Sequence, residues 1–104
     1  MKVIRLEKQF TKGDCDFTQL ERTENKALYQ RTYRNSGVVN YEVITFKPQP
    51  SLTVSADGTF TKHNDVLKEY YPSDEKFGQN GWWFTDYQRA KDYYDTKEPV
   101  FGVE

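Results

Sequence analysis

Hydrophobic and polar positions alternate along several short stretches of the chain, and this two-residue period is typical of half-buried β-strands. The strongest stretch is 38–47, VVNYEVITFK, where β-branched and aromatic residues fall on both sides of the pattern, as in a central strand. Stretch 27–33 alternates as well, and the turn 24–26 separates it from the weaker stretch 17–23. We expect 27–33 to pair antiparallel with both neighbours, and a further half-exposed strand over 4–10.

A hairpin is expected at about 51–62. Pro48 and Pro50 end the central strand, because proline lacks the amide hydrogen that a strand ladder needs. Asp57-Gly58 then supplies the turn, since these residues suit a type I′ or bulged hairpin turn. Only three large apolar residues could anchor the hairpin to a core: Leu52, Val54 and Phe60. We therefore expect it to project as an exposed insertion.

A helix is expected at about 86–96, followed by a short tail over 98–104. Thr85 and Gln88 form a capping-box pattern, in which each side chain bonds to the other residue's backbone amide. Apolar positions then recur at helical spacing, and Pro99 cannot continue the helix. The chain thus predicts a C-terminal helix with one apolar face.

These elements predict a single α+β domain over residues 1–104. Its fold should be a twisted antiparallel sheet of four to five strands, with the C-terminal helix packed on one face and the hairpin projecting. Aromatic residues form 16% of the chain and the mean hydropathy is −0.96, so aliphatic residues are scarce. We expect the core to be built largely from aromatic rings, each of which buries a large area.

The stretch 70–83, YYPSDEKFGQNGWW, gathers five aromatic residues around turn-forming residues. Ser73 is placed to cap a single helical turn that Gly78 ends, and a strand follows over 81–84. Alternation puts the two tryptophans on opposite faces of that strand, so one of them should point away from the main core. An exposed tryptophan is a frequent interface anchor. The residues expected to bind a partner are Trp82, Trp83, Tyr70, Phe77 and Phe60.

The sequence offers little for catalysis. His63 is the only histidine and Cys15 the only cysteine, which is too few for a metal site. Two flanking aspartates disfavour a thiolate at Cys15, so a nucleophile is not expected there. Three acidic pairs fall in turns or on a polar helix face and are expected to be solvated: Asp14/Asp16, Asp74/Glu75 and Asp92/Asp95. We expect no enzyme activity, no cofactor and no metal.

An aromatic and basic face offers an alternative function. Tyr29, Arg31 and Tyr33 share one side of their strand, with Arg22 and Arg34 near in sequence. Aromatic rings among arginines can stack on the bases of single-stranded nucleic acid. The competing structural explanation is that both tyrosines belong to a half-buried sheet face. The net charge of −1 favours that explanation but leaves nucleic-acid binding as the alternative.

Localisation and assembly follow from what the sequence lacks. A single cysteine cannot form an internal disulfide, and the first residues have no apolar segment of the export type. No stretch is long and apolar enough to cross a bilayer. We expect a cytoplasmic protein without a membrane partner. Open sheet edges could also pair two copies, so a homo-oligomer stays open.

Short motifs follow one another between about residues 17 and 95. They are Phe17–Thr23, Ala27–Tyr29, Tyr41–Ile44, Tyr71-Pro72-Ser73, Phe77-Gly78, Trp82-Trp83-Phe84-Thr85 and Ala90. In this order they resemble a group of small accessory proteins encoded by tailed bacteriophages and prophages. The sequence of sheet, aromatic-Gly turn, aromatic strand and helix is also similar to the DNA-binding WGR domain, although Phe77-Gly78-Gln79 stands where Trp-Gly-Arg would be.

The phage resemblance implies an accessory protein working in the host cytoplasm, and it brings no activity or site residue. Together with the exposed tryptophan and hairpin, it leads us to expect a non-enzymatic protein that binds and modulates a host or phage protein. An inhibitor of a host enzyme or of an anti-phage defence system would be of this kind. The nucleic-acid-binding domain is the alternative.

Overall fold

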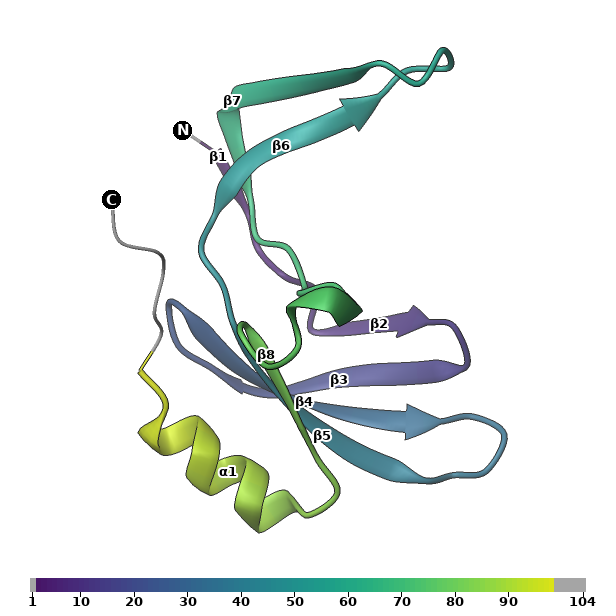
Figure 1. Cartoon of the computed structure of the whole chain (residues 1–104), viewed down its shortest axis with the longest axis vertical. Helices are drawn as coiled ribbons and strands as arrows, with labels where there is room; N and C mark the ends of the chain where they lie inside the picture. Colours follow the sequence, from purple (N-terminus) through teal and green to yellow (C-terminus); the bar gives the residue numbers. More distant parts are fainter. Residues whose placement is uncertain (1, 99–104) are drawn as a thin grey trace.

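The computed structural model describes residues 2–98, which form two sheets, one α-helix and one short 3-10 turn (Figure 1). The larger sheet has the order β2 (Gln9–Lys12), β3 (Cys15–Arg22), β4 (Lys26–Tyr33), β5 (Val39–Thr45) and β8 (Gly81–Phe84). The smaller sheet has the order β1 (Lys2–Ile4), β7 (Phe60–Lys68) and β6 (Gln49–Val54). The 3-10 turn η1 spans Asp74–Lys76, and α1 spans Tyr87–Thr96. The α+β class and a main sheet of the expected size are therefore confirmed.

The pairing of the central strands follows the sequence pattern. β4 pairs antiparallel with β3 on one side and with β5 on the other, in the register Leu28↔Val43 and Tyr29↔Glu42. β8 adds to the far side of β5, with Val43↔Trp82 and Glu42↔Trp83. Alternation of side chains across a strand therefore gives this sheet two distinct faces.

The N-terminal strand expected over 4–10 was wrong as a single element. β1 pairs in parallel with β7, whereas β2 pairs antiparallel with β3, so the two segments belong to different sheets. The chain leaves the strand geometry at Arg5–Lys8, where the Leu6 amide donates to a Glu69 carboxylate oxygen at 2.9 Å instead of to a strand. A buried side chain far along the sequence thus takes the place of a ladder partner.

Each face of the larger sheet has its own core. One face buries a cluster of Cys15, Phe17, Ala27, Tyr29, Ile44 and Phe46, against which Leu6, Phe10, Tyr33 and Tyr71 pack. The rings of Phe10, Phe17, Tyr29 and Tyr71 meet with centroids 4.7 to 5.6 Å apart. The other face buries Leu28 and Val43 beneath Ala90 and Tyr94 of α1. Aromatic rings carry much of the interior, as the composition predicts.

Helix α1 begins one residue later than the capping-box pattern predicts. Asp86 is the N-cap, with extended backbone angles, and its carboxylate accepts from the Arg89 amide at 2.9 Å. The prediction of Thr85 as the cap was therefore wrong. Asp86 is the better cap because its carboxylate accepts the cap hydrogen bond and also interacts favourably with the positive end of the helix dipole. Similarly, Ser73 precedes η1 without a side-chain cap bond, although Gly78 follows the turn with a φ of 98° as expected.

The hairpin around Asp57-Gly58 is present and longer than 51–62. Its two strands, β6 and β7, extend from the base near Glu69 to the tip, and among the strands of residues 2–98 only the short β1 pairs with them. We call this β6–β7 hairpin the arm, and Figure 1 shows it at the opposite end of the molecule from α1. The radius of gyration, 15.0 Å, exceeds the roughly 13 Å of a compact domain of this length, as a projecting arm requires. The expected tail lies outside the described residues except for Glu98.

Candidate partner-binding surface

The β6–β7 arm has one apolar face and one polar face. Val54 pairs with Phe60 and Leu52 with Lys62, and cross-strand partners point to the same side of a ribbon. Leu52, Val54 and Phe60 are 53%, 61% and 67% exposed. These three side chains therefore form an apolar strip on one face of the arm, with Lys62 beside Leu52 on the same face, and they remain largely exposed within the described chain.

The opposite face of the arm is polar. Thr53 pairs with Thr61 and Ser51 with His63, and the His63 Nε2 lies 2.9 Å from the Thr53 hydroxyl. His63 thus belongs to strand β7, and it bonds to a side chain of its own hairpin. A ribbon with apolar and polar sides is the pattern of an element that covers another surface.

The tip of the arm is held by its own hydrogen bonds. The Asp57 carboxylate accepts from the Ser55 hydroxyl at 3.0 Å and from the Thr59 amide at 3.0 Å. Bonds from Thr59 and Ser55 hold the pKa of Asp57 below its usual value. Gly58 has a φ of 86°, which glycine adopts without strain. The apolar strip is therefore presented by a well-formed hairpin.

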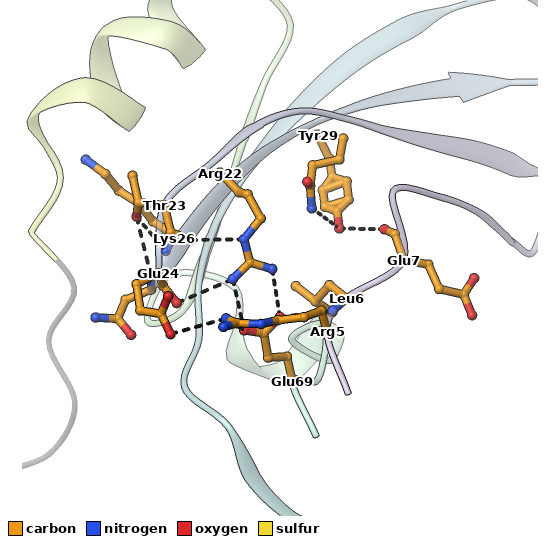
Figure 2. A network of polar contacts seen from close by, with 11 residues as sticks. Arg5, Leu6, Glu7, Arg22, Thr23, Glu24, Lys26, Tyr29 and Glu69 are labelled. Atoms are coloured by element: carbon orange, nitrogen blue, oxygen red, sulfur yellow. Dashed lines mark hydrogen bonds and ion pairs between the residues drawn. The ribbon is translucent and has the colours of Figure 1, made fainter. Parts of the chain in front are cut away.

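The base of the arm is tied to the larger sheet through Glu69, as Figure 2 shows. Its side chain is fully buried and accepts from both terminal nitrogens of Arg22 at 2.8 and 2.9 Å. It also accepts from the Leu6 amide at 2.9 Å and from Arg5 at 3.0 Å. Burial alone would raise the pKa of Glu69, but these hydrogen bonds outweigh it and hold the pKa below the usual value.

The Glu69 network joins three separate parts of the chain. Arg5 and Leu6 lie between β1 and β2, Arg22 ends β3, and Glu69 directly follows β7. Arg5 also reaches the exposed Glu24 at 3.2 Å. Because a buried carboxylate with four hydrogen bonds has little freedom to move, the network fixes the direction in which the arm leaves the sheet. The pattern of the sequence contained no signal for this contact.

The structure decides between the two tryptophans. Trp83 is 51% exposed and lies on the outer strand β8, on the sheet face that carries Glu42. Trp82 points to the other face, where its ring lies 5.2 Å from Tyr93 and the Lys97 ammonium 4.4 Å from its centroid. Trp83 is therefore the tryptophan left outside the core, and Trp82 is packed against α1.

The other residues expected to bind a partner lie in different places. Phe60 sits on the arm, Tyr70 is 37% exposed at its base, and Phe77 is half-buried. A Cβ added to Gly81 would lie 2.9 Å from the Phe77 ring, so that ring covers the start of β8. The structure therefore gives Phe77 a packing role and leaves Phe60, Tyr70 and Trp83 accessible.

A second buried carboxylate lies in the larger sheet. Glu42 accepts from the Tyr71 hydroxyl at 2.6 Å and from Arg31 at 2.9 Å, while the Arg31 Nε donates to the Cys15 sulfur at 3.2 Å. Burial and the charge of Glu42 raise the pKa of Tyr71, which keeps the phenol protonated as a donor. A hollow of about 240 Å³ borders this group.

The polar groups of this Glu42 cluster are buried or half-buried and bonded to one another. Cys15 is only 2% exposed, and both Glu42 oxygens already accept hydrogen bonds. The sequence analysis did not predict the cluster. The signal that could have found it is a glutamate in the middle of the strongest apolar strand, since a buried carboxylate requires cationic or hydroxyl partners.

The residues of the nucleic-acid alternative all have partners within the chain, although Arg34 and its partner Asp16 are exposed. Tyr29 is fully buried, and its hydroxyl donates to the Glu7 carbonyl at 2.8 Å, so its ring offers no face to a base. Arg22 is held by Glu69 and Arg31 by Glu42. Arg34 bonds to Asp16 at 2.8 Å and to the Gly13 carbonyl. Tyr33 stays half-buried under the Arg31 guanidinium, 4.9 Å from its ring centroid.

The described residues contain no group of three or more histidine, cysteine, aspartate or glutamate side chains that could hold a metal ion. Within residues 2–98, no helix has the length and apolar character needed to cross a membrane. Comparisons of the chain with protein families, with curated proteins and with solved structures each found no match. The geometry of the arm is therefore what supports a functional proposal.

Proposed function

We propose that this chain is a non-enzymatic accessory protein that binds and modulates a host or phage protein. The contact is made by the apolar strip of the arm, defined as Leu52, Val54 and Phe60. The observation that carries the proposal is the exposure of all three side chains on one side of a ribbon whose other side is polar. An exposed apolar strip on an arm that the Glu69 network fixes to the sheet is typical of a protein-binding element.

The size of the strip sets the expected affinity. Full burial of a leucine, valine or phenylalanine side chain is worth about 1.5–3 kcal/mol, and these three are roughly half to two-thirds exposed. Covering them would contribute about 3–5 kcal/mol in total, which corresponds to roughly 10²- to 4 × 10³-fold in affinity. Loss of a single member should then weaken a complex by about tenfold. Trp83 is a second candidate contact that the same partner could use.

Affinity capture with matched arm variants tests this function. The tagged chain is incubated with lysate of infected bacteria, beside Phe60→Ser on the apolar side and Thr61→Ser on the polar side. We expect one protein to be retained by the wild-type chain and by Thr61→Ser, and lost with Phe60→Ser. That protein is then purified and its dissociation constant measured with all three chains.

Two results would refute this function. A retained protein that binds Phe60→Ser as tightly as the wild-type chain would show that the arm is not the contact. A complex of two copies of this chain, detected by light scattering and dissolved by Phe60→Ser, would show that the strip pairs with itself. The nucleic-acid alternative is tested in parallel by a gel shift of nucleic acid at low salt. We expect no complex with the wild-type chain, and therefore no effect of Tyr33→Ser.

A further inference from the structure

Strand β6 leaves one edge of the smaller sheet open. The sheet has the order β1-β7-β6, so no strand of residues 2–98 pairs with the outer side of β6. Beyond the stretch Val66–Lys68 that pairs with β1, the arm is a two-stranded hairpin. Such a hairpin is only marginally stable unless a further strand or a core supports it. A strand added along the outer edge of β6 would therefore stabilise the arm.

Leu52 and Val54 direct their backbone groups to this open edge. The Ser55 amide donates to the Thr59 carbonyl at 2.9 Å, so Ser55 and Thr59 are a hydrogen-bonded pair of the hairpin. Bonded and non-bonded pairs alternate in an antiparallel ladder, so Leu52 and Val54 do not bond to β7 and point outward instead. The Leu52 amide accordingly donates to the Tyr70 hydroxyl, over a long 3.3 Å. A strand along β6 would offer this amide a carbonyl in place of that hydroxyl.

The open edge of β6 lacks the charges that commonly protect a sheet edge. Residues 48–56 contain no charged side chain, although charged residues form 30% of the chain. By contrast, β1 and β2 each carry a lysine, and the first residue of β8 is already bridged by Phe77. Charged side chains on an edge strand oppose its pairing with another chain, and with an identical chain they bring like charges together. Among the terminal strands of the described chain, β6 is therefore the one best suited to pair with a second copy.

This edge is complementary to itself. When two copies of β6 run antiparallel about a two-fold axis at Thr53, Leu52 of each copy faces Val54 of the other. Both residues point their backbone groups to the edge, so each such pair can exchange hydrogen bonds in both directions. The side chains match as well, because leucine faces valine on the apolar side, while Thr53 faces Thr53 and Ser51 faces Ser55 on the polar side.

We infer that two copies of this chain associate through the outer edges of β6, antiparallel about Thr53, and form a continuous sheet of the order β7-β6-β6-β7. Pro50 has no amide hydrogen and ends the pairing toward the base of each arm, so the interface is short. Interfaces below about 1,200 Å² belong to weak complexes, so we expect a dimer that depends on concentration. The inference does not rest on the proposed function, because the pairing uses the backbone edge and leaves the apolar strips of both copies exposed on one face.

Disulfide trapping of the full chain tests this register. In a non-bonded antiparallel pair the Cα atoms lie about 4.5 Å apart, which suits a disulfide, so Thr53→Cys should give a cross-linked dimer with diamide. Thr61→Cys is the matched control, because Thr61 is also exposed and faces Thr53 across the hairpin. Its two copies would be separated by three strand spacings, about 14 Å, which is too far for a disulfide. Both variants keep the buried Cys15, so its background is the same, and Thr53→Cys should cross-link about tenfold faster or more.

Sedimentation velocity measures the association without a cross-link. The apparent mass of the wild-type chain should rise above 12.3 kDa as the protein concentration is raised. Thr53→Lys should weaken the dimer by about tenfold, because two ammonium groups would face each other across the axis, whereas Thr61→Lys should change it by less than about threefold. Phe60→Ser removes a member of the apolar strip but no edge group, so the dimer should persist. This variant separates the two proposals, because it should abolish capture of the partner protein.

Several results would overturn the inference. Equal cross-linking of Thr53→Cys and Thr61→Cys would show that chance collisions or another surface bring the copies together. A mass that stays at 12.3 kDa at every concentration would show that the edge does not pair with itself. A dimer that Thr53→Lys leaves unchanged would place the contact elsewhere. A monomeric wild-type chain whose lysate partner is lost with Thr53→Lys would assign the edge to a strand of another protein.

Discussion

Replacement of Glu69 by glutamine tests whether the arm is fixed to the sheet by a buried charge. Glutamine has nearly the same shape as glutamate, so the change removes the charge without opening a large cavity. One carboxylate oxygen becomes an NH₂ group, which is a donor facing the donors of Arg22, Arg5 and the Leu6 amide. The variant therefore leaves buried donors opposed to one another.

The expected loss in the free energy of unfolding is about 3 kcal/mol. Removal of one partner of a buried ion pair costs about 3–5 kcal/mol. We place Glu69→Gln at the lower end, because the side chains of Arg22 and Arg5 are 22% and 49% exposed and water can resolvate them. Glu24→Gln is the matched control. Glu24 pairs with Arg5 at 3.2 Å but is 71% exposed, so its loss should cost less than about 1 kcal/mol.

Urea denaturation followed by far-ultraviolet circular dichroism measures both free energies. Hydrogen exchange adds the location of the effect: amides of β6 and β7 should lose more protection in Glu69→Gln than amides of β4. The reasoning would be refuted by a Glu69→Gln variant as stable as Glu24→Gln, or by equal loss of protection in the arm and in β4. Either result would mean that Glu69 does not control the base of the arm.

The pH dependence of the same pair gives an independent check. The pKa of Glu69 is held below its ordinary value of 4.5, so the carboxylate stabilises the fold above about pH 4.5. This contribution is lost as the pH falls through the lower pKa of the folded state. The stability difference between the wild-type chain and Glu69→Gln should consequently be constant near neutral pH and shrink in acid. A difference that grows in acid would contradict the assigned charge state.

Three further predictions follow from local contacts. Asp86→Ala should lower the free energy of unfolding by about 1 kcal/mol and Thr85→Ala by much less, as measured by urea denaturation, because Asp86 accepts the cap hydrogen bond; equal effects would restore Thr85 as the cap. Gly81→Ala should destabilise the fold by about 1–3 kcal/mol in the same assay, since its Cβ would lie 2.9 Å from the Phe77 ring; a free energy of unfolding unchanged from wild type would contradict that contact. Trp83→Leu should remove most of the fluorescence that acrylamide quenches, because Trp83 is 51% exposed, and quenching that persists at the original level would mean that the other tryptophan is accessible.

Local pattern alone determined the central part of the fold. The strands β3, β4 and β5 and their antiparallel order follow from alternation and from turns between neighbouring segments. The hairpin follows from Asp57-Gly58, and α1 follows from helical spacing and an N-terminal cap. These features depend on residues close together in sequence, so their causes can be read along the chain.

The candidate sites were only partly predictable. The sequence placed Phe60 on a projecting hairpin and required one tryptophan to leave the core, and both expectations hold. It could not choose Trp83 over Trp82, because that choice depends on where α1 packs. It also set Tyr29 on a possible stacking face, whereas the rings of Phe10 and Tyr71 cover it in the folded chain. Exposure is a property of the assembled layers.

Tertiary structure alone decided how the arm is attached. The Leu6 amide and Glu69 are 63 residues apart, and Arg22 and Glu69 are 47 apart. Glutamate near the end of a strand looks like an ordinary surface residue, because its local neighbours do not reveal that distant donors converge on it. The parallel pairing of β1 with β7 has the same origin. What the sequence determined is therefore the set of local elements, while the contacts between distant segments determined how those elements present the arm.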